Sequence, residues 1–192
     1  FLAAYYEKQK DYTNAMQLYR KALKIDENVD KAWYGLGVCM YEQERWYEAI
    51  HFFKKALKIN DCCDEYWLAL ANAEYQVGNV ISANEAYEKA NQLNAFNADV
   101  WLNWSFAFFE EGNYEQAIQL ITDAHEIMPD NTEILYHACA YHLAAGNFKE
   151  GFMYLEQALI LDFDGHEILY DIFTNTEMQK AIARMTSQYK KQ

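Results

Sequence analysis

The chain has 192 residues, of which 52% are hydrophobic and 17% aromatic, so it can bury a sizeable core. Its formal net charge of −13 argues against a nucleic-acid partner, and no run of about 18 apolar residues is present to insert into a membrane. One proline and seven glycines leave long unbroken stretches, which favour helix.

From the start of the chain, the predicted elements are pairs of amphipathic helices that recur at a step of 34 residues. Five series of small or apolar residues keep this step without an insertion. They are Ala15, Ala49, Ala83, Ala117 and Gly151; Ala22, Ala56, Ala90, Ala124 and Ala158; Ile25, Ile59, Leu93, Ile127 and Leu161; Tyr19, Phe53, Tyr87, Ile121 and Leu155; and Trp33, Trp67, Trp101, Leu135 and Leu169. Such a fixed step is typical of repeat folds.

Each repeat is expected to turn back on itself once, between its two helices. In three repeats a Gly-Asn pair stands at this point, and glycine can adopt the left-handed conformation that ends a helix. The expected turns lie near Lys10, Glu44, Gly78, Gly112 and Gly146. The first repeat begins in the middle of its first helix, so we expect the protein to continue upstream of Phe1.

This pattern resembles the tetratricopeptide repeat (TPR) family, whose signature places an aromatic residue, Leu-Gly and Tyr on one helix and Ala, an aromatic, Ala and Pro on the next. The second repeat carries it as Trp33, Leu36-Gly37, Ala49, Phe53 and Ala56, and the fourth as Trp101, Gly112, Tyr114, Ala117, Ala124 and Pro129. The family proline is kept only at Pro129. The resemblance covers residues 1–165 and implies an all-α, right-handed α-α superhelical solenoid of about five TPR helical hairpins, with the first repeat truncated.

The remaining residues, 166–192, are predicted to be C-terminal capping helices. They open like a sixth first helix, break at 174–176, and continue as a further helix. The apolar residues of the two segments are Ile168, Leu169, Ile172 and Phe173, then Met178, Ile182, Met185 and Tyr189. A stacked repeat array needs such a segment to close its exposed apolar end.

The sequence holds no signature of catalysis or of metal binding. A glycine-rich phosphate loop, a G-x-S-x-G elbow and an H-E-x-x-H motif are all missing. His137 and His142 are five residues apart and point about 140° apart on a helix, so they cannot share a metal. We therefore predict no enzyme activity, no cofactor and no metal.

The four cysteines are expected to be ordinary reduced thiols. Cys39, Cys62, Cys63 and Cys139 match no zinc spacing, and adjacent cysteines rarely form a disulfide with each other. Reduced thiols favour a reducing compartment, so we expect a cytoplasmic protein.

In the TPR family the first helices line a concave groove where peptides bind, and a helical wheel identifies the corresponding stripe here. The candidate groove residues are Glu65, Asn72, Gln76, Asp99, Asn103, Phe106, Glu110, Glu133, Tyr136 and His137. The cap adds Glu167 and Asp171 to the same side. Family members that bind chaperone C-termini use Lys, Arg and Asn in the groove, whereas acids or neutral residues stand there in this chain. We therefore do not expect it to bind chaperone tails.

An acidic row, Glu65, Asp99 and Glu133, recurs along this groove every 34 residues. Residues 60–148 hold fourteen acids and one base, so most of the negative charge lies in this part of the chain. A concavity lined by one sign of charge attracts the opposite sign. Phe106 and Tyr136 are predicted to be apolar anchors for a bound segment, and Asn72 and Asn103 are predicted to contact its backbone.

The leading functional hypothesis is a protein–protein interaction scaffold or adaptor that binds a peptide or helix of a partner in the groove. The partner segment is expected to be basic or amide-rich. The alternative is a structural or regulatory segment of a longer protein, which either self-associates or packs against an attached enzyme domain. An acidic surface that only keeps the chain soluble would also produce the observed charge.

Overall fold

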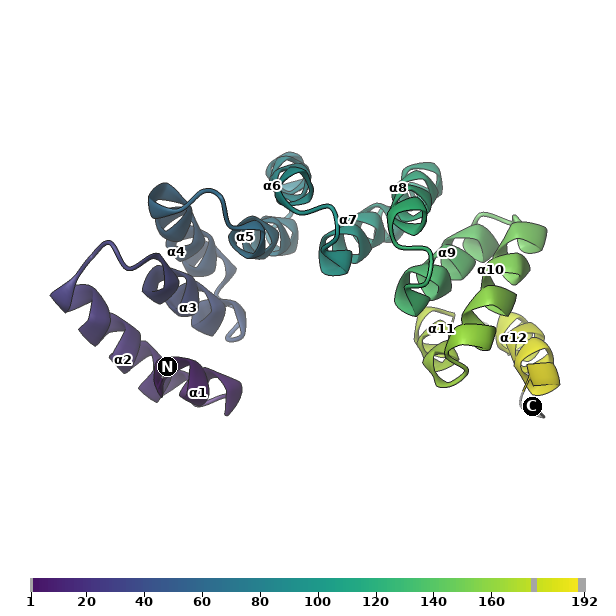
Figure 1. Ribbon diagram of the computed structural model, residues 1–192, viewed down its shortest axis with the longest axis horizontal. Helices are drawn as coiled ribbons and strands as arrows, with labels where there is room; N and C mark the ends of the chain where they lie inside the picture. The colour runs from purple at the N-terminus through teal and green to yellow at the C-terminus, as the bar shows by residue number, and fades with distance from the viewer. Residues whose placement is uncertain (1, 174–175, 190–192) are drawn as a thin grey trace. The chain divides into compact units, whose positions relative to one another are not determined.

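The computed structural model describes residues 2–173 and 176–189, and every regular element in these two ranges is a helix (Figure 1). The chain separates into two compact units, residues 1–95 and 96–192. The all-helical prediction is confirmed, and so is the succession of five helical hairpins. The superhelical sense and the boundary at residue 165 between array and cap stay predictions.

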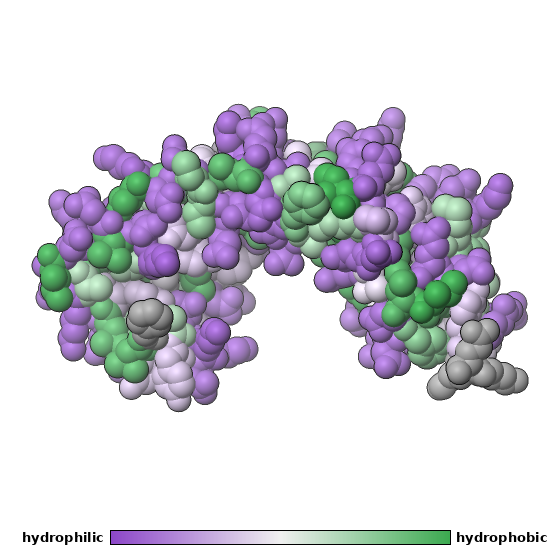
Figure 2. All heavy atoms as spheres, in the orientation of Figure 1, coloured by the Kyte–Doolittle hydropathy of each residue, from purple (hydrophilic) through white to green (hydrophobic). Residues whose placement is uncertain are grey.

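The first unit holds three consecutive hairpins. Their helices are α1 (Leu2–Lys8), α2 (Tyr12–Ile25), α3 (Asp30–Tyr41), α4 (Trp46–Ile59), α5 (Asp64–Gln76) and α6 (Val80–Leu93). Figure 2 shows hydrophilic side chains over the side of α6 that is turned away from α5. Helices α2 to α6 each bury apolar residues where they pack against a neighbour, whereas α1 buries none of its described residues.

The second unit holds two hairpins and the C-terminal segment. Its elements are α7 (Ala98–Glu110), α8 (Tyr114–Ile127), α9 (Thr132–Ala144), α10 (Phe148–Leu161), the 3₁₀ helix η1 (Asp164–Glu167), α11 (Ile168–Ile172) and α12 (Thr176–Tyr189). Leu169 and Ile182 are completely buried, and Met178, Met185 and Tyr189 pack against the same core. The predicted break at 174–176 lies largely outside the described residues.

The five predicted turns are confirmed by the backbone dihedral angles. Lys10 and Glu44 each have φ of +59°, and Gly78, Gly112 and Gly146 have φ of +78°, +76° and +81°. At each turn a backbone N–H reaches back five residues to a carbonyl of the preceding helix, as Asn79 does to Glu74 at 2.9 Å. This bond satisfies a carbonyl that the end of a helix leaves without a partner.

Small residues stand where two helices approach closely. The recurring alanines Ala49, Ala83 and Ala117 are at most 1% exposed. At Gly37 a Cβ atom would lie 2.4 Å from the Phe53 ring, and at Gly35 one would lie 2.2 Å from the Tyr19 ring. Gly37 of the Leu-Gly element is therefore required for packing of α3 against α4, and Gly35 for packing of α3 against α2.

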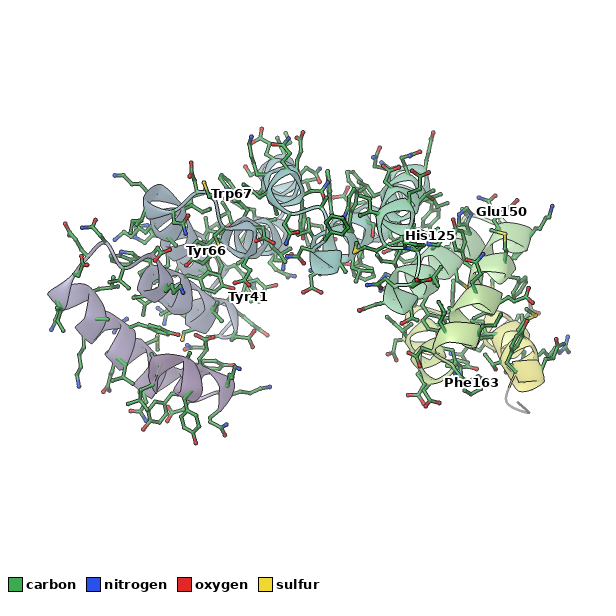
Figure 3. All side chains as sticks on the ribbon, in the orientation of Figure 1. Tyr41, Tyr66, Trp67, His125, Glu150 and Phe163 are labelled. Atoms are coloured by element: carbon green, nitrogen blue, oxygen red, sulfur yellow. The ribbon has the colours of Figure 1, made fainter. Side chains whose placement is uncertain are left out.

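The three tryptophans of the 34-residue step lie in two kinds of surroundings. Trp101 is only 5% exposed, whereas Trp33 and Trp67 are partly buried. The indole N–H of Trp33 donates to the carbonyl of Glu27 at 2.8 Å, and that of Trp67 donates to the carbonyl of Asp61 at 2.7 Å. Figure 3 shows Trp67 at the beginning of α5, beside the loop to which it bonds. These two indoles thus fix the loops between hairpins.

Candidate protein-binding site

The second unit contains a hollow of about 450 Å³ between its first helices and the C-terminal segment, which we call the acidic hollow. Helices α7, α9 and α11 supply its walls. The lining residues are Asp99, Leu102, Asn103, Phe106, Phe109 and Glu110 from α7, Glu133 and His137 from α9, and Ile168, Asp171 and Ile172 from α11. It therefore combines four carboxyl groups with an apolar floor.

Six of the ten candidate groove residues line the acidic hollow together. They are Asp99, Asn103, Phe106, Glu110, Glu133 and His137. The sequence also placed Asp171 on this side, and it is there. The sequence did not predict that Ile168 and Ile172 of α11 line the hollow. They were assigned only to the apolar side of the capping helices.

Tyr136 corrects the prediction of an apolar anchor. Its side chain is only 1% exposed, and its hydroxyl donates to the backbone carbonyl of Asp162. Burial raises the pKa of this phenol well above its usual value. Tyr136 therefore belongs to the core and fixes the loop after α10, and a bound segment cannot use it as an anchor.

A short chain of buried polar side chains stands behind the acidic hollow. The Ser105 hydroxyl lies 3.2 Å from the carbonyl of Leu102 and 3.3 Å from the hydroxyl of Tyr141. The Tyr141 hydroxyl in turn lies 2.9 Å from Nδ1 of His137, which is 8% exposed. Burial lowers the pKa of His137 to about 4, so its imidazole is neutral at neutral pH.

Three of the four carboxylates of the acidic hollow are available to a ligand. Those of Asp99, Glu133 and Asp171 lie on exposed residues and make no ion pair or hydrogen bond with the rest of the described chain. Phe106 and Phe109 stack with ring centroids 6.0 Å apart, and Phe109 stacks on Tyr141 at 4.8 Å. Unpaired acids thus surround a continuous aromatic wall.

The other predicted groove residues belong to the first unit, where the surroundings differ. A smaller hollow of about 190 Å³, here the tyrosine hollow, is lined by Tyr34, Val38, Tyr41, Glu42, Phe53, Ala69 and Asn72. Asn72 accepts a hydrogen bond of 2.6 Å from the Tyr87 hydroxyl. Gln76 is exposed and hydrogen-bonds Tyr41, and the exposed Glu65 lines neither hollow.

The buried thiols are poor nucleophiles. All four cysteines are free, and burial raises the pKa of Cys39 and of Cys139 to about 12. Among residues 2–173 and 176–189, no three or more His, Cys, Asp or Glu side chains are grouped so that they could hold a metal ion. None of the helices described is both long and apolar enough to cross a membrane.

Comparison with known proteins identifies the repeat. Two family models described as tetratricopeptide repeat match the chain, one over residues 7–73 and 108–159 and the other over residues 68–132. No protein with curated annotation matches the sequence.

Several solved structures share the fold at low sequence identity. MamA is 20% identical with a TM-score of 0.74, over 87% of this chain and 98% of its own. YrrB, described as a TPR protein with an unusual peptide-binding site, is 21% identical with a TM-score of 0.67, over 88% and 87%. The C-terminal part of a TPR protein from Cytophaga hutchinsonii is 15% identical with a TM-score of 0.77, over 98% and 78%. Together with the family models, which match well over half of the chain, these comparisons show that the chain belongs to the tetratricopeptide repeat family.

Proposed function

We propose that the chain is a protein-interaction scaffold that binds a basic or amide-rich segment of a partner protein in the acidic hollow of its second unit. The observation that carries this proposal is that the unpaired carboxylates of Asp99, Glu133 and Asp171 stand beside the apolar side chains of the same hollow. Same-sign charges in a concavity focus the electrostatic potential and raise the local concentration of oppositely charged ligands.

The apolar part of the hollow gives the proposed segment a second point of attachment. Phe106 and Ile172 are partly buried and line the hollow beside the acids. Binding sites for ligands commonly combine such apolar walls with a few polar groups that fix orientation, in volumes of about 300–1,000 Å³. The amide of Asn103 can hydrogen-bond a partner's backbone, which contacts the segment without reading its sequence.

The similarity to YrrB supports a peptide ligand at the level of fold. The charge of this hollow separates the chain from family members that clamp a carboxylate, because Asp99, Glu133 and Asp171 would repel one. The expected partner segment therefore presents cationic side chains.

A second candidate function is a structural segment that packs against another domain or a second copy. Leu2 and Tyr5 on α1 are each 58% exposed, and α1 buries none of its described residues. An exposed apolar surface of this kind favours a covering partner. Sedimentation of the chain and of a Leu2→Ser, Tyr5→Ser variant tests it, since a second copy held by α1 would dissociate in the variant.

The direct test of the proposal is peptide selection followed by substitution in the hollow. Peptides selected from a random library for binding to the chain are measured by fluorescence anisotropy against Asp99→Asn, Glu133→Gln, Asp171→Asn. We expect the Kd to rise about tenfold, because three exposed charge interactions of a few tenths to 1 kcal/mol each are lost.

A matched control removes three exposed acids of the same unit outside the hollow, as Glu115→Gln, Glu126→Gln, Asp130→Asn. This control removes the same number of negative charges as the hollow variant. It therefore separates the effect of contacts in the hollow from the effect of the protein's net charge. We expect its Kd to stay within about twofold of the wild-type value. Equal losses in both variants, or a loss in neither, would contradict the proposed site.

A further inference from the structure

We infer that the acidic hollow selects arginine over lysine in the bound segment, because its acceptors and its aromatic wall match a guanidinium group. This inference rests on the proposed function and states which side chain the hollow reads. Both cations carry one positive charge, so charge alone does not distinguish them. Geometry, hydration and the number of donors must make the difference.

The carboxylate acceptors of the acidic hollow are spread over several helices. Asp99, Glu133 and Asp171 stand on three different helices, α7, α9 and α11, and none of their carboxylates has a partner among the described residues. A guanidinium presents five N–H donors in a planar fork, whereas an ammonium presents three on a single nitrogen. Acceptors that approach from three helices are satisfied better by the wider fork.

The hydrogen bonds of Ser105, Tyr141 and His137 behind the hollow have one consistent direction. The Leu102 carbonyl can only accept, so the Ser105 hydroxyl donates to it. Ser105 has no second proton, so the Tyr141 hydroxyl donates to Ser105 Oγ. Nδ1–H of His137 then donates to the Tyr141 oxygen, which is the one direction that satisfies all three contacts.

This chain leaves Nε2 of the neutral His137 as a hydrogen-bond acceptor. His137 lines the hollow, is more than nine-tenths buried, and has no partner for Nε2 among residues 2–173 and 176–189. Nε2 is not among the atoms shut off from solvent, so a donor in the hollow can reach it, and a ligand N–H there replaces water as its hydrogen-bond partner. A guanidinium that donates to the carboxylates still has further N–H groups that can donate to Nε2.

The aromatic wall of the hollow also suits a guanidinium better than an ammonium. The stacked rings of Phe106 and Phe109 form part of the lining, and Leu102 and Ile168 add aliphatic surface for the stem of a long side chain. A guanidinium is planar and weakly hydrated, so it lies on aromatic rings with little loss of hydration. An ammonium is compact and strongly hydrated, and loses more on entering the hollow.

The experiment compares three peptides that differ in one side chain. The host is acetyl-Gly-Ser-Leu-Arg-Leu-Ser-Gly-amide, and its partners carry lysine or the neutral isostere citrulline in place of arginine. We expect calorimetry at neutral pH and low salt to give a Kd about fivefold lower for arginine than for lysine, and about tenfold lower than for citrulline. Equal Kd values for arginine and lysine, or for arginine and citrulline, would overturn the inference.

Two variants place this preference in the hollow. His137→Asn keeps a polar group near the position of Nδ1 and removes Nε2, so it should reduce the preference for arginine over lysine at unchanged net charge. Asp171→Asn changes an exposed residue of α11, and should weaken both cationic peptides while the citrulline peptide is unaffected. Thermal melts confirm that each variant is folded.

The outcomes separate this inference from the proposed function. If library-selected peptides bind in the hollow but the arginine and lysine peptides bind alike, the inference is wrong and the proposed function stands. If neither the selected peptides nor the arginine peptide depends on Asp99, Glu133 and Asp171, both are wrong.

Discussion

The tyrosine hollow of the first unit and the acidic hollow of the second occupy equivalent places in the repeat but offer different chemistry. Val38 and Asn72 stand at the repeat position that Phe106 occupies in the second unit, and Glu42 stands at that of Glu110. The repeat thus determines where a hollow forms, and the residues at a few positions determine what it can bind.

The difference lies in whether the polar groups are already used. In the first unit Asn72 bonds Tyr87, and Glu42 accepts a hydrogen bond of 3.2 Å from the Tyr12 hydroxyl. In the second unit the carboxylates of Asp99, Glu133 and Asp171 bond no described residue. Internal pairing makes the tyrosine hollow part of the scaffold, while unpaired acids leave the acidic hollow available to a ligand.

The largest expected effect concerns the C-terminal segment, whose helix α11 forms a wall of the acidic hollow that the tyrosine hollow lacks. Ile182→Ala should lower the free energy of unfolding by about 2–5 kcal/mol, because Ile182 is completely buried and its truncation leaves a cavity. Leu2→Ala on the exposed helix α1 is the matched control and should have little effect. Urea unfolding of both variants measures the contrast, and equal effects would show that α12 does not seal the second unit.

The next effect is a loss of stability at acidic pH, caused by the buried His137 of the second unit. Burial holds the pKa of His137 at about 4, below the value of about 6.5 expected in the unfolded chain. The unfolded state therefore binds more protons between these values, so stability is fully present above pH 6.5 and falls towards pH 4, by up to about 3 kcal/mol. Burial also lowers the pKa of His142, which acts in the same direction.

Urea unfolding across this pH range measures the effect, with His137→Asn as the comparison. The variant lacks the group that titrates, so its stability should depend less on pH between these values. An identical pH dependence in the two proteins would contradict the role assigned to His137.

A smaller effect separates the two hollows by their charges. Glu42→Gln in the tyrosine hollow should leave the Kd of a selected peptide within about twofold of the wild-type value, whereas Asp171→Asn should raise it about threefold. Fluorescence anisotropy at low and high salt measures both, and the difference should shrink at high salt because exposed charges are screened. A larger loss with Glu42→Gln would place the binding site in the first unit.

An effect of similar size concerns the turns. Glu44 adopts a left-handed conformation that is strained for any residue except glycine, while Gly112 meets the same requirement without strain. Glu44→Gly should raise the free energy of unfolding by about 0.5–1 kcal/mol. Gly112→Ala should lower it by about 1 kcal/mol, through the backbone alone, because nothing lies within 4 Å of the added Cβ. Chemical unfolding of each variant checks both signs, and a destabilised Glu44→Gly variant would refute the explanation.

The step of 34 residues was sufficient to predict the helices, their turns and most of the acidic hollow. Asp99 and Glu133 recur on successive first helices, so the helical wheel placed them on one side, and the second unit brings them together. The turns at Lys10 and Glu44 were predicted because the step continues through residues that are not glycine.

The rest depended on contacts that periodicity does not contain. Tyr136 bonds the carbonyl of Asp162, which lies 26 residues away in a loop that closes over it, and the helical wheel says nothing about such a loop. Helix α11 follows the last complete repeat, where the step of 34 residues no longer applies. The repeat pattern therefore could not place Ile168 and Ile172 in the groove. The chain of Ser105, Tyr141 and His137 joins residues of two helices, and only the packing of α7 against α9 reveals it.

The central claim is that a partner segment binds in the acidic hollow, and the most direct measurement is methyl NMR of the isoleucine-labelled chain during titration with a library-selected peptide. Ile168 and Ile172 line the hollow, while the exposed Ile81 and Ile160 lie elsewhere in the two units. We expect the methyl signals of Ile168 and Ile172 to shift with added peptide and those of Ile81 and Ile160 to stay unchanged. Shifts at Ile81 or Ile160 with Ile168 and Ile172 unchanged would contradict the central claim.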